Sequence, residues 1–183
     1  MTAADAQQSA LQTVLAKEAI RDVLLRYSFG MDRRDHEVLA SAFWPGAPLE
    51  YGMFKGSGQE FARFILPWFS NEGMQVTSHF LGNALIRVEQ DKAWAETYFN
   101  AFHCAPDPYG TMRDVFVCGR YHDSFERRDH EWRIAHRRLH FDWFREYPDT
   151  GDWTVGSYGV TTTSATIGTP NEPAWEPLRS HLL

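Results

Sequence analysis

Two residues that can move a proton stand out, an acid at the end of a helical pattern and a histidine inside a strand-like pattern. Asp32 follows "FGM" at the end of an apolar helical run, and His79 lies in "TSHFLGN". An acid at a helix end is usually solvated, and a histidine in a strand is usually a core residue. Either both are structural, or the fold brings them together as an acid–histidine pair suited to proton transfer.

The N-terminal third of the chain shows helical patterns. Apolar residues recur at helical spacing from Leu11 to Met31, after a small, polar start at residues 1–10 that we expect to be flexible. Asp35 could cap a second, short helix, and the capping-box pattern "SGQE" precedes a third. We interpret the apolar residues of this third helix as core: Phe61, Phe64, Ile65, Trp68 and Phe69. Before it, "LEYGMF" predicts a short strand at residues 49–54.

Beyond Gly73 the apolar period changes to two, which is typical of strands. Four runs separated by turn sequences predict an antiparallel meander. They cover residues 75–89, 92–104, 112–126 and 131–144. Helices followed by such a sheet predict an α+β fold, a cone in which a curved sheet and the helices enclose a pocket. We expect one domain at 11–146 and a Gly-, Pro- and Thr-rich tail at 147–183, which could be a lid, an inter-subunit arm or a partly disordered segment.

Strand alternation sorts the side chains of the sheet onto two faces. One face is largely apolar and suits a ligand cavity, and it holds Phe99, Ala101, His103, Val117, Gly119, Tyr121, Arg137, Leu139 and Phe141. The other face is polar and includes Arg138 and His140. Because a single layer of sheet needs cover on both faces, we expect a homotrimer or homodimer built on this outer face.

Composition and motifs narrow the partners and cofactors. A net charge of −6 over 183 residues argues against a nucleic-acid partner. No apolar run reaches membrane-spanning length, and the N-terminus lacks the pattern of a signal peptide, so we expect a cytoplasmic protein with no membrane partner. The aromatic content of 15% provides enough rings to line a cavity as well as to fill the core.

No cofactor is expected from the motifs. His136 and His140 share a strand face but lie roughly 13 Å apart along a strand, too far for two ligands that each sit about 2 Å from one zinc ion. Cys104 and Cys118 lack zinc-site spacing. No Gly-rich phosphate loop or dinucleotide fingerprint occurs, so we expect neither a metal nor a nucleotide cofactor.

Three stretches of the sequence resemble the SnoaL-like branch of the nuclear transport factor 2-like superfamily. They are "KEAIRDVLLRYSFGMDRRDHEVLASAFW", "TSHFLGNALI" and "YHDSFERRDHEWRIAHRR", and the likeness spans roughly residues 15–145. Members include scytalone dehydratase, hexachlorocyclohexane dehydrochlorinase, bile-acid 7α-dehydratase and polyketide cyclases. The resemblance implies a cone-shaped, cystatin-like fold, which hosts many activities.

The resemblance also implies which residues act. Asp32 and His79 match the acid and histidine of the dehydrochlorinase dyad, in which the acid orients the histidine as general base. Tyr27 stands where the dehydrochlorinase pattern has lysine, which favours a hydroxyl leaving group over a halide. Arg137 matches a last-strand arginine that would anchor or polarise an oxygen. On an ideal helix Tyr27 and Asp32 are about 140° apart, so they converge only if the helix breaks or tightens near Gly30.

These points predict a cofactor-independent lyase, of the dehydratase type, acting on a hydrophobic aromatic or polycyclic hydroxylated molecule. The predicted substrate-binding residues are Tyr51, Phe99, His103, Val117, Tyr121, Leu139 and Phe141. Family members active on lignin-derived diarylpropanes suggest a variant in which formaldehyde release follows dehydration. An isomerase or an aldol cyclase would use the same base chemistry. A non-catalytic β subunit of a ring-hydroxylating dioxygenase and a ligand-binding module are the alternatives from other classes.

Overall fold

This computed structural model describes residues 2–74, 76–151 and 175–183, which form helices, strands and the turns between them. The helices are α1 (Ala3–Asp32), α2 (His36–Ser41), α3 (Gly58–Asn71) and α4 (Glu176–Leu182). The strands are β1 (Pro48–Tyr51), β2 (Phe54–Ser57), β3 (Val76–Glu89), β4 (Lys92–Pro106), β5 (Met112–Arg128) and β6 (Glu131–Pro148). No helix in these ranges is long and apolar enough to cross a bilayer.

The strands form one sheet in the order β2-β1-β6-β5-β4-β3. It is antiparallel except where β1 runs parallel to β6. The long strands β3 to β6 follow one another as the predicted meander, which confirms that part of the prediction. The single strand predicted at 49–54 was wrong: Gly52 adopts a φ of 54° and turns the chain between β1 and β2, so the segment is a hairpin.

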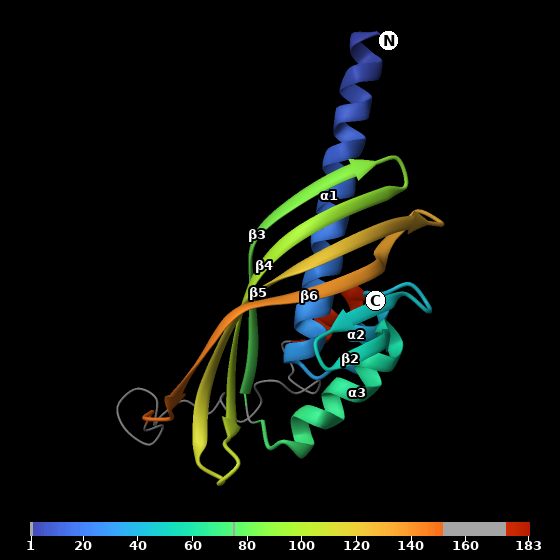
Figure 1. Ribbon diagram of the computed structural model, residues 1–183. Helices are drawn as coiled ribbons and strands as arrows, with labels where there is room; N and C mark the ends of the chain where they lie inside the picture. The colour runs from blue at the N-terminus through green and yellow to red at the C-terminus, as the bar shows by residue number, and fades with distance from the viewer. Residues whose placement is uncertain (1, 75, 152–174) are drawn as a thin grey trace.

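The sheet is bent and unclosed, and helices α1 to α3 gather on one side of it (Figure 1). Helix α1 packs on β3 and β6, and α3 packs on the β1–β2 hairpin. A single cluster of buried hydrophobic residues fills the space between the helices and the sheet. This arrangement confirms the predicted α+β cone and leaves an apolar space between α3 and the strands.

Helix α1 begins at Ala3 and not at Leu11, where the apolar pattern begins. Thr2 and Asp5 form a capping box that satisfies backbone N–H groups at this end of the helix. Residues 3–15 are exposed, and the helix extends beyond the sheet (Figure 1). The capping residues therefore extend the helix into the segment that the apolar pattern could not assign.

The last described segment packs against the start of α2. Arg179 of α4 donates to the carboxylates of Asp35 and Glu37, each at 2.6 Å, and the indole N–H of Trp175 donates to Asp35 at 3.3 Å. Asp35 also caps α2, as predicted. The predicted lid or arm falls mostly on residues 152–174, which lie outside the described residues.

Candidate active site

The acid and the histidine singled out in the sequence are in direct contact. The carboxylate of Asp32 accepts the backbone N–H of His79 at 2.8 Å and lies 2.7 Å from its ring Nδ1. Because an ionised carboxylate can only accept a hydrogen bond, Nδ1 carries the proton and Nε2 presents a lone pair. The side chain of His79 is 2% exposed and that of Asp32 is 21% exposed. A general base and its orienting acid require this arrangement.

Two elements that pack together place the pair. Asp32 is the last residue of α1, and His79 lies near the start of β3, against which α1 packs. Helix α1 continues unbroken through Gly30, where an added Cβ would lie 2.6 Å from backbone atoms of Leu39. The missing side chain lets α2 approach closely, so glycine serves this crossing and does not end the helix.

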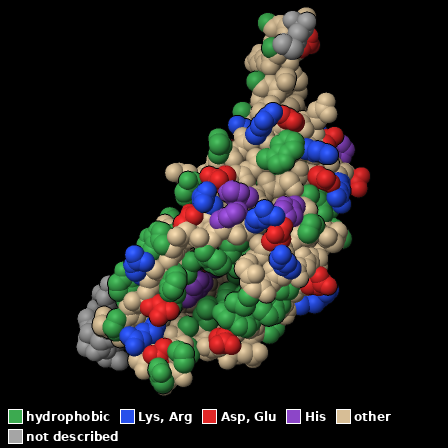
Figure 2. Space-filling view, in the orientation of Figure 1, with side chains coloured by type: hydrophobic (Ala, Val, Ile, Leu, Met, Phe, Trp, Pro, Cys, Tyr) green, Lys and Arg blue, Asp and Glu red, His purple; other side chains and the backbone are tan. Residues whose placement is uncertain are grey.

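His79 lines a cavity of about 320 Å³ between α3 and the inner face of the sheet. Figure 2 shows a hollow walled by hydrophobic side chains with a histidine set into it. The strand wall includes Phe99, Ala101, Val117 and Phe141, so the cavity face was assigned correctly from strand alternation. The size and apolar walls are typical of a site for a small hydrophobic ligand.

Helix α3 forms the facing wall. Five residues that the sequence pattern assigns to the core line the cavity: Phe61, Phe64, Ile65, Trp68 and Phe69. Three of them, Phe61, Ile65 and Phe69, are also nearly inaccessible to solvent, so they serve the core and the cavity together. The amphipathic pattern of α3 correctly gave its buried face but could not show that this face borders a cavity.

His103 lies beside His79, and the two ring centroids are 5.6 Å apart. Burial, together with the neighbouring His79, lowers the pKa of His103 to about 3, so its ring is neutral at physiological pH. Its Nδ1 is buried and has no hydrogen-bond partner among the residues that the structure describes. His103 therefore offers an unused polar atom at the cavity, as expected for a residue that contacts a ligand.

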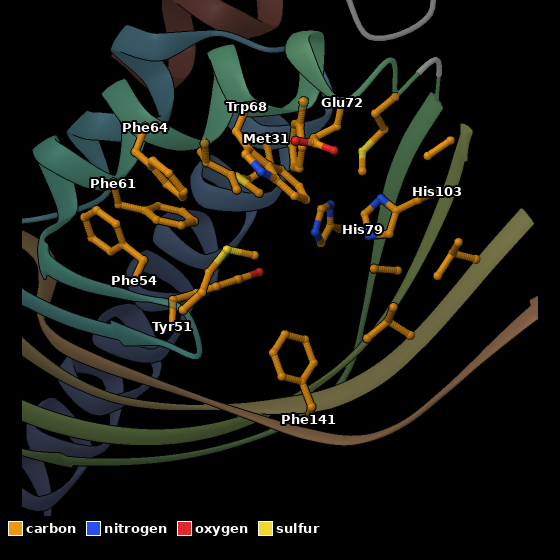
Figure 3. Close-up of a pocket in the computed structure, with 18 of the residues that line it drawn as sticks. Met31, Tyr51, Phe54, Phe61, Phe64, Trp68, Glu72, His79, His103 and Phe141 are labelled. Carbon is orange, nitrogen blue, oxygen red and sulfur yellow. The ribbon is translucent and has the colours of Figure 1, made fainter. Parts of the chain in front are cut away.

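Tyr51 brings a phenol to the same cavity. Burial raises the pKa of Tyr51, and the neighbouring Tyr27 hydroxyl and Arg137 charge offset that rise only in part. The phenol is therefore protonated at neutral pH and can donate a hydrogen bond. Figure 3 shows Tyr51, His79 and Phe141 around one open space, with the Tyr51 hydroxyl at its edge.

Comparison with known proteins identifies the family of this chain. The model of the SnoaL-like domain matches residues 12–138. The chain belongs to the SnoaL-like family. No curated protein sequence matches it.

Solved structures with the SnoaL-like fold cover most of this chain. A candidate scytalone dehydratase from Novosphingobium aromaticivorans is 22% identical over 76% of this chain and 97% of its own, with a TM-score of 0.64. The hexachlorocyclohexane dehydrochlorinase LinA-type3 from Novosphingobium barchaimii is 19% identical over 78% and 97%, with a TM-score of 0.66. An NTF2-like protein with a cystatin-like fold, also from N. aromaticivorans, is 24% identical over 74% and 88%, with a TM-score of 0.59. At these identities the likeness establishes the fold.

Four residues predicted for the site of this SnoaL-like cone lie beneath the cavity and do not line it: Tyr27, Tyr121, Arg137 and Leu139. Tyr27 is fully buried and packs its ring against Phe43, Phe61 and Tyr121. Because α1 does not break before Asp32, Tyr27 stays on the core side of the helix. Its predicted contact with a leaving group is therefore wrong as a direct contact.

Arg137 is fully buried and does not line the cavity. Its Nε and one terminal nitrogen donate to Asp123 at 2.7 Å each, and its guanidinium lies 4.1 Å from the ring centroids of Tyr27 and Tyr121. Strand alternation gave the correct face for Arg137 but not its depth below the cavity. The predicted role as an oxygen anchor is therefore corrected to a buried ion pair in the floor of the cone.

Two further features complete the description of the site. In the described ranges, no three His, Cys, Asp or Glu side chains cluster closely enough to hold a metal ion. The cavity also includes Met31 and Glu72, which sequence reasoning did not assign to it. Met31 belongs to the apolar stripe of α1, whereas Glu72 follows the last residue of α3 and had no sequence signal of its own.

Proposed function

We propose that this protein is a cofactor-independent lyase that eliminates water from a hydrophobic, hydroxylated aromatic or polycyclic molecule. The observation that carries the proposal is the Asp32–His79 contact at the wall of an apolar cavity. A histidine base whose side chain is only 2% exposed and that a carboxylate orients suits removal of a proton from carbon. Relatives with the same fold carry the names of a dehydratase and a dehydrochlorinase, which supports elimination as the reaction class.

In this proposal His79 is the base and Asp32 its orienting partner. Nε2 takes a proton from the carbon next to the one that bears the hydroxyl, and Asp32 stabilises the imidazolium. The C–H electron pair forms the double bond while the C–O bond breaks. The imidazolium returns its proton to the departing oxygen, which leaves as water and restores the neutral ring.

Tyr51 supports departure of the leaving oxygen in this proposal. Its phenol lines the cavity and stays protonated, so it can donate a hydrogen bond as negative charge develops on that oxygen. Tyr27 contributes indirectly, because its buried hydroxyl lies near that of Tyr51 and influences its pKa. This assigns to Tyr51 the direct contact that the sequence pattern gave to Tyr27.

The substrates to test first follow from the aromatic walls of the cavity. We include lignin-derived diarylpropanes, for which loss of water would be followed by C–C cleavage and release of formaldehyde. Purified full-length protein is incubated with a panel of hydroxylated aromatic compounds, and products are identified by mass spectrometry. We expect a product lighter by one water, and from a diarylpropane a product lighter by one water and one formaldehyde. His79→Ala should reduce its rate by about 10²–10⁴-fold, the usual contribution of a general base.

His136→Ala is the matched control, since this histidine lies on the outer sheet face beside Glu50. It should retain the wild-type rate. A product of unchanged mass would indicate an isomerase. Ligands bound in the cavity but recovered unchanged from every incubation would indicate a binding module. Melting temperatures of both variants separate loss of catalysis from loss of fold.

We also propose that the outer sheet face joins copies of this chain into a homotrimer or homodimer. Tyr98, Phe102 and Trp143 on this face are 47%, 50% and 44% exposed. The ring of Phe116 lies 4.5 Å from that of Phe102 and 5.1 Å from that of Trp143, centroid to centroid. A contiguous aromatic patch of this kind is unusual on a free surface. Light scattering at micromolar concentration tests the proposal, which a monomer would contradict.

A further inference from the structure

One ionisable carboxylate stands out among the cavity residues. Glu72 is the only Asp, Glu, Lys or Arg side chain among the described residues that line the cavity, whose other walls are mainly aromatic and aliphatic. Figure 3 shows its carboxylate directed into the same space as Trp68 and His79. A negative charge beside an apolar cavity acts on any charged ligand that enters it.

The backbone holds Glu72 in place. Its N–H donates to the carbonyl of Trp68 at 2.9 Å, which closes the last turn of α3. Gly73 then adopts a φ of 68° and turns the chain toward β3, packing so closely that an added Cβ would lie 3.1 Å from Pro106 of β4. The side chain therefore projects from a fixed point at the cavity edge.

Stability does not explain an acid at this position. The carbonyl end of a helix carries partial negative charge, so a carboxylate there is mildly unfavourable. Among the described residues, the Glu72 side chain makes no hydrogen bond or ion pair. The guanidinium of Arg34 donates nearby, to the carbonyl oxygen of Met74. Glu72 is exposed at the cavity edge, where water solvates its carboxylate, so its position among the lining residues makes it the candidate for selecting the ligand.

We infer that Glu72 is a specificity residue that admits neutral, hydroxylated ring compounds and rejects anionic ones such as aromatic acids. The inference rests on the proposed function, because it takes this cavity as the substrate site. Its carboxylate can accept a hydrogen bond from a hydroxyl at the substrate's outer end, and it repels a carboxylate or sulfonate. At a partly solvated cavity edge this repulsion corresponds to about a tenfold loss of affinity for a singly charged anion.

Two fluorescent probes with one ring skeleton test the inference. N-phenyl-1-naphthylamine is neutral, and 8-anilino-1-naphthalenesulfonate adds one sulfonate. Both are titrated into full-length wild-type protein and into Glu72→Gln. We expect the variant to bind the anionic probe about tenfold more tightly and the neutral probe within about twofold of wild type. Glu72→Lys should lower the dissociation constant of the anionic probe further.

Glu89→Gln is the matched control, because it removes the same charge from the far end of β3. It should leave both dissociation constants unchanged. Equal strengthening of anionic-probe binding by Glu72→Gln and Glu89→Gln would overturn the inference. So would a Glu72→Gln protein in which the ratio of the anionic-probe to the neutral-probe dissociation constant equals that of wild type. In both cases the proposed function stands.

A second pair of variants shows where the probes bind. Both Val115 and Val117 of β5 line the cavity. Replacing either with tryptophan narrows the cavity and should weaken the binding of both probes. Failure of the neutral probe to bind wild type, or binding that neither tryptophan affects, would overturn both this inference and the proposed substrate site. Circular dichroism confirms that each variant is folded.

Discussion

Asp32→Asn is the sharpest test of the proposed chemistry, because it replaces one of the two carboxylate oxygens that contact His79 with an NH2 group. In the wild type, one carboxylate oxygen accepts the backbone N–H of His79 at 2.8 Å and the other lies 2.7 Å from Nδ1. Asparagine has only one accepting oxygen, so it cannot serve both donors. It also lacks the negative charge that stabilises the imidazolium.

The magnitude follows from those two losses. A hydrogen bond to a charged group contributes about 1.5–3 kcal/mol, which corresponds to about 10- to 150-fold in rate. The charge pair that exists only after proton transfer is worth up to about 4 kcal/mol at an effective dielectric constant of about 20, or about 10³-fold. We therefore expect kcat to fall by about 10- to 10³-fold. KM should change little, because the charged pair forms after the substrate binds.

Turnover and nitrogen NMR provide the two readouts. The ¹⁵N spectrum of the wild type should show His79 protonated at Nδ1, and Asp32→Asn should weaken that preference. Asp22→Asn is the matched control, because Asp22 is an exposed acid on the same helix. A wild-type ring protonated at Nε2, or an Asp32→Asn protein with full kcat, would refute the base assignment.

Three further outcomes follow from the structure. Arg137→Met or Asp123→Asn alone should lower the free energy of unfolding by about 3–5 kcal/mol, because each leaves one partner of the fully buried pair unpaired. In calorimetry, the double variant should regain part of the stability that either single variant loses. The pKa of His103 is about 3 in the folded protein and about 6.5 in the unfolded chain. The contribution of His103 to the free energy of unfolding is therefore complete above pH 6.5 and falls as the pH drops toward 3. Between pH 7 and pH 5 the free energy of unfolding should therefore fall by about 2 kcal/mol less in His103→Asn than in the wild type, as measured by urea unfolding. Phe116→Glu should dissociate the proposed oligomer in light scattering and leave the monomer folded, because the substitution places a charge in the outer aromatic patch.

The two candidate residues and the cavity face were predictable from local sequence patterns, whereas the pairing of Asp32 with His79 was predictable only from the family resemblance. Helical spacing ends at Asp32, and strand alternation places Phe99 and Ala101 on the face that lines the cavity. These patterns require no knowledge of which strands meet. The contact of Asp32 with His79 then follows from the packing of α1 on β3, which the family resemblance implied.

The role of Arg137 was not predictable in the same way, because it depends on a β-bulge. The pairing of β5 with β6 shifts by one residue between Ser124 and Phe125, and this shift sets Asp123 opposite Arg137. Without the shift, Asp123 would face His136, and Arg137 would have a different cross-strand partner. The sequence around the bulge contains no glycine or proline to signal it.

In the proposed reaction, the buried pair keeps acid–base chemistry at the cavity and away from the floor of the cone. An unpaired arginine beneath the cavity would stabilise negative charge on any bound oxygen. Asp123 accepts two hydrogen bonds from Arg137, so the pair has no net charge, and the flanking rings of Tyr27 and Tyr121 separate it from the cavity. In the proposed reaction, the charge that develops is therefore stabilised mainly by Asp32, with Tyr51 as a neutral hydrogen-bond donor. On this argument Arg137→Met lowers the melting temperature far more than kcat, whereas Asp32→Asn lowers kcat far more than the melting temperature. A comparable loss of melting temperature and kcat in either variant would show that the Arg137–Asp123 pair and the Asp32–His79 pair do not act independently.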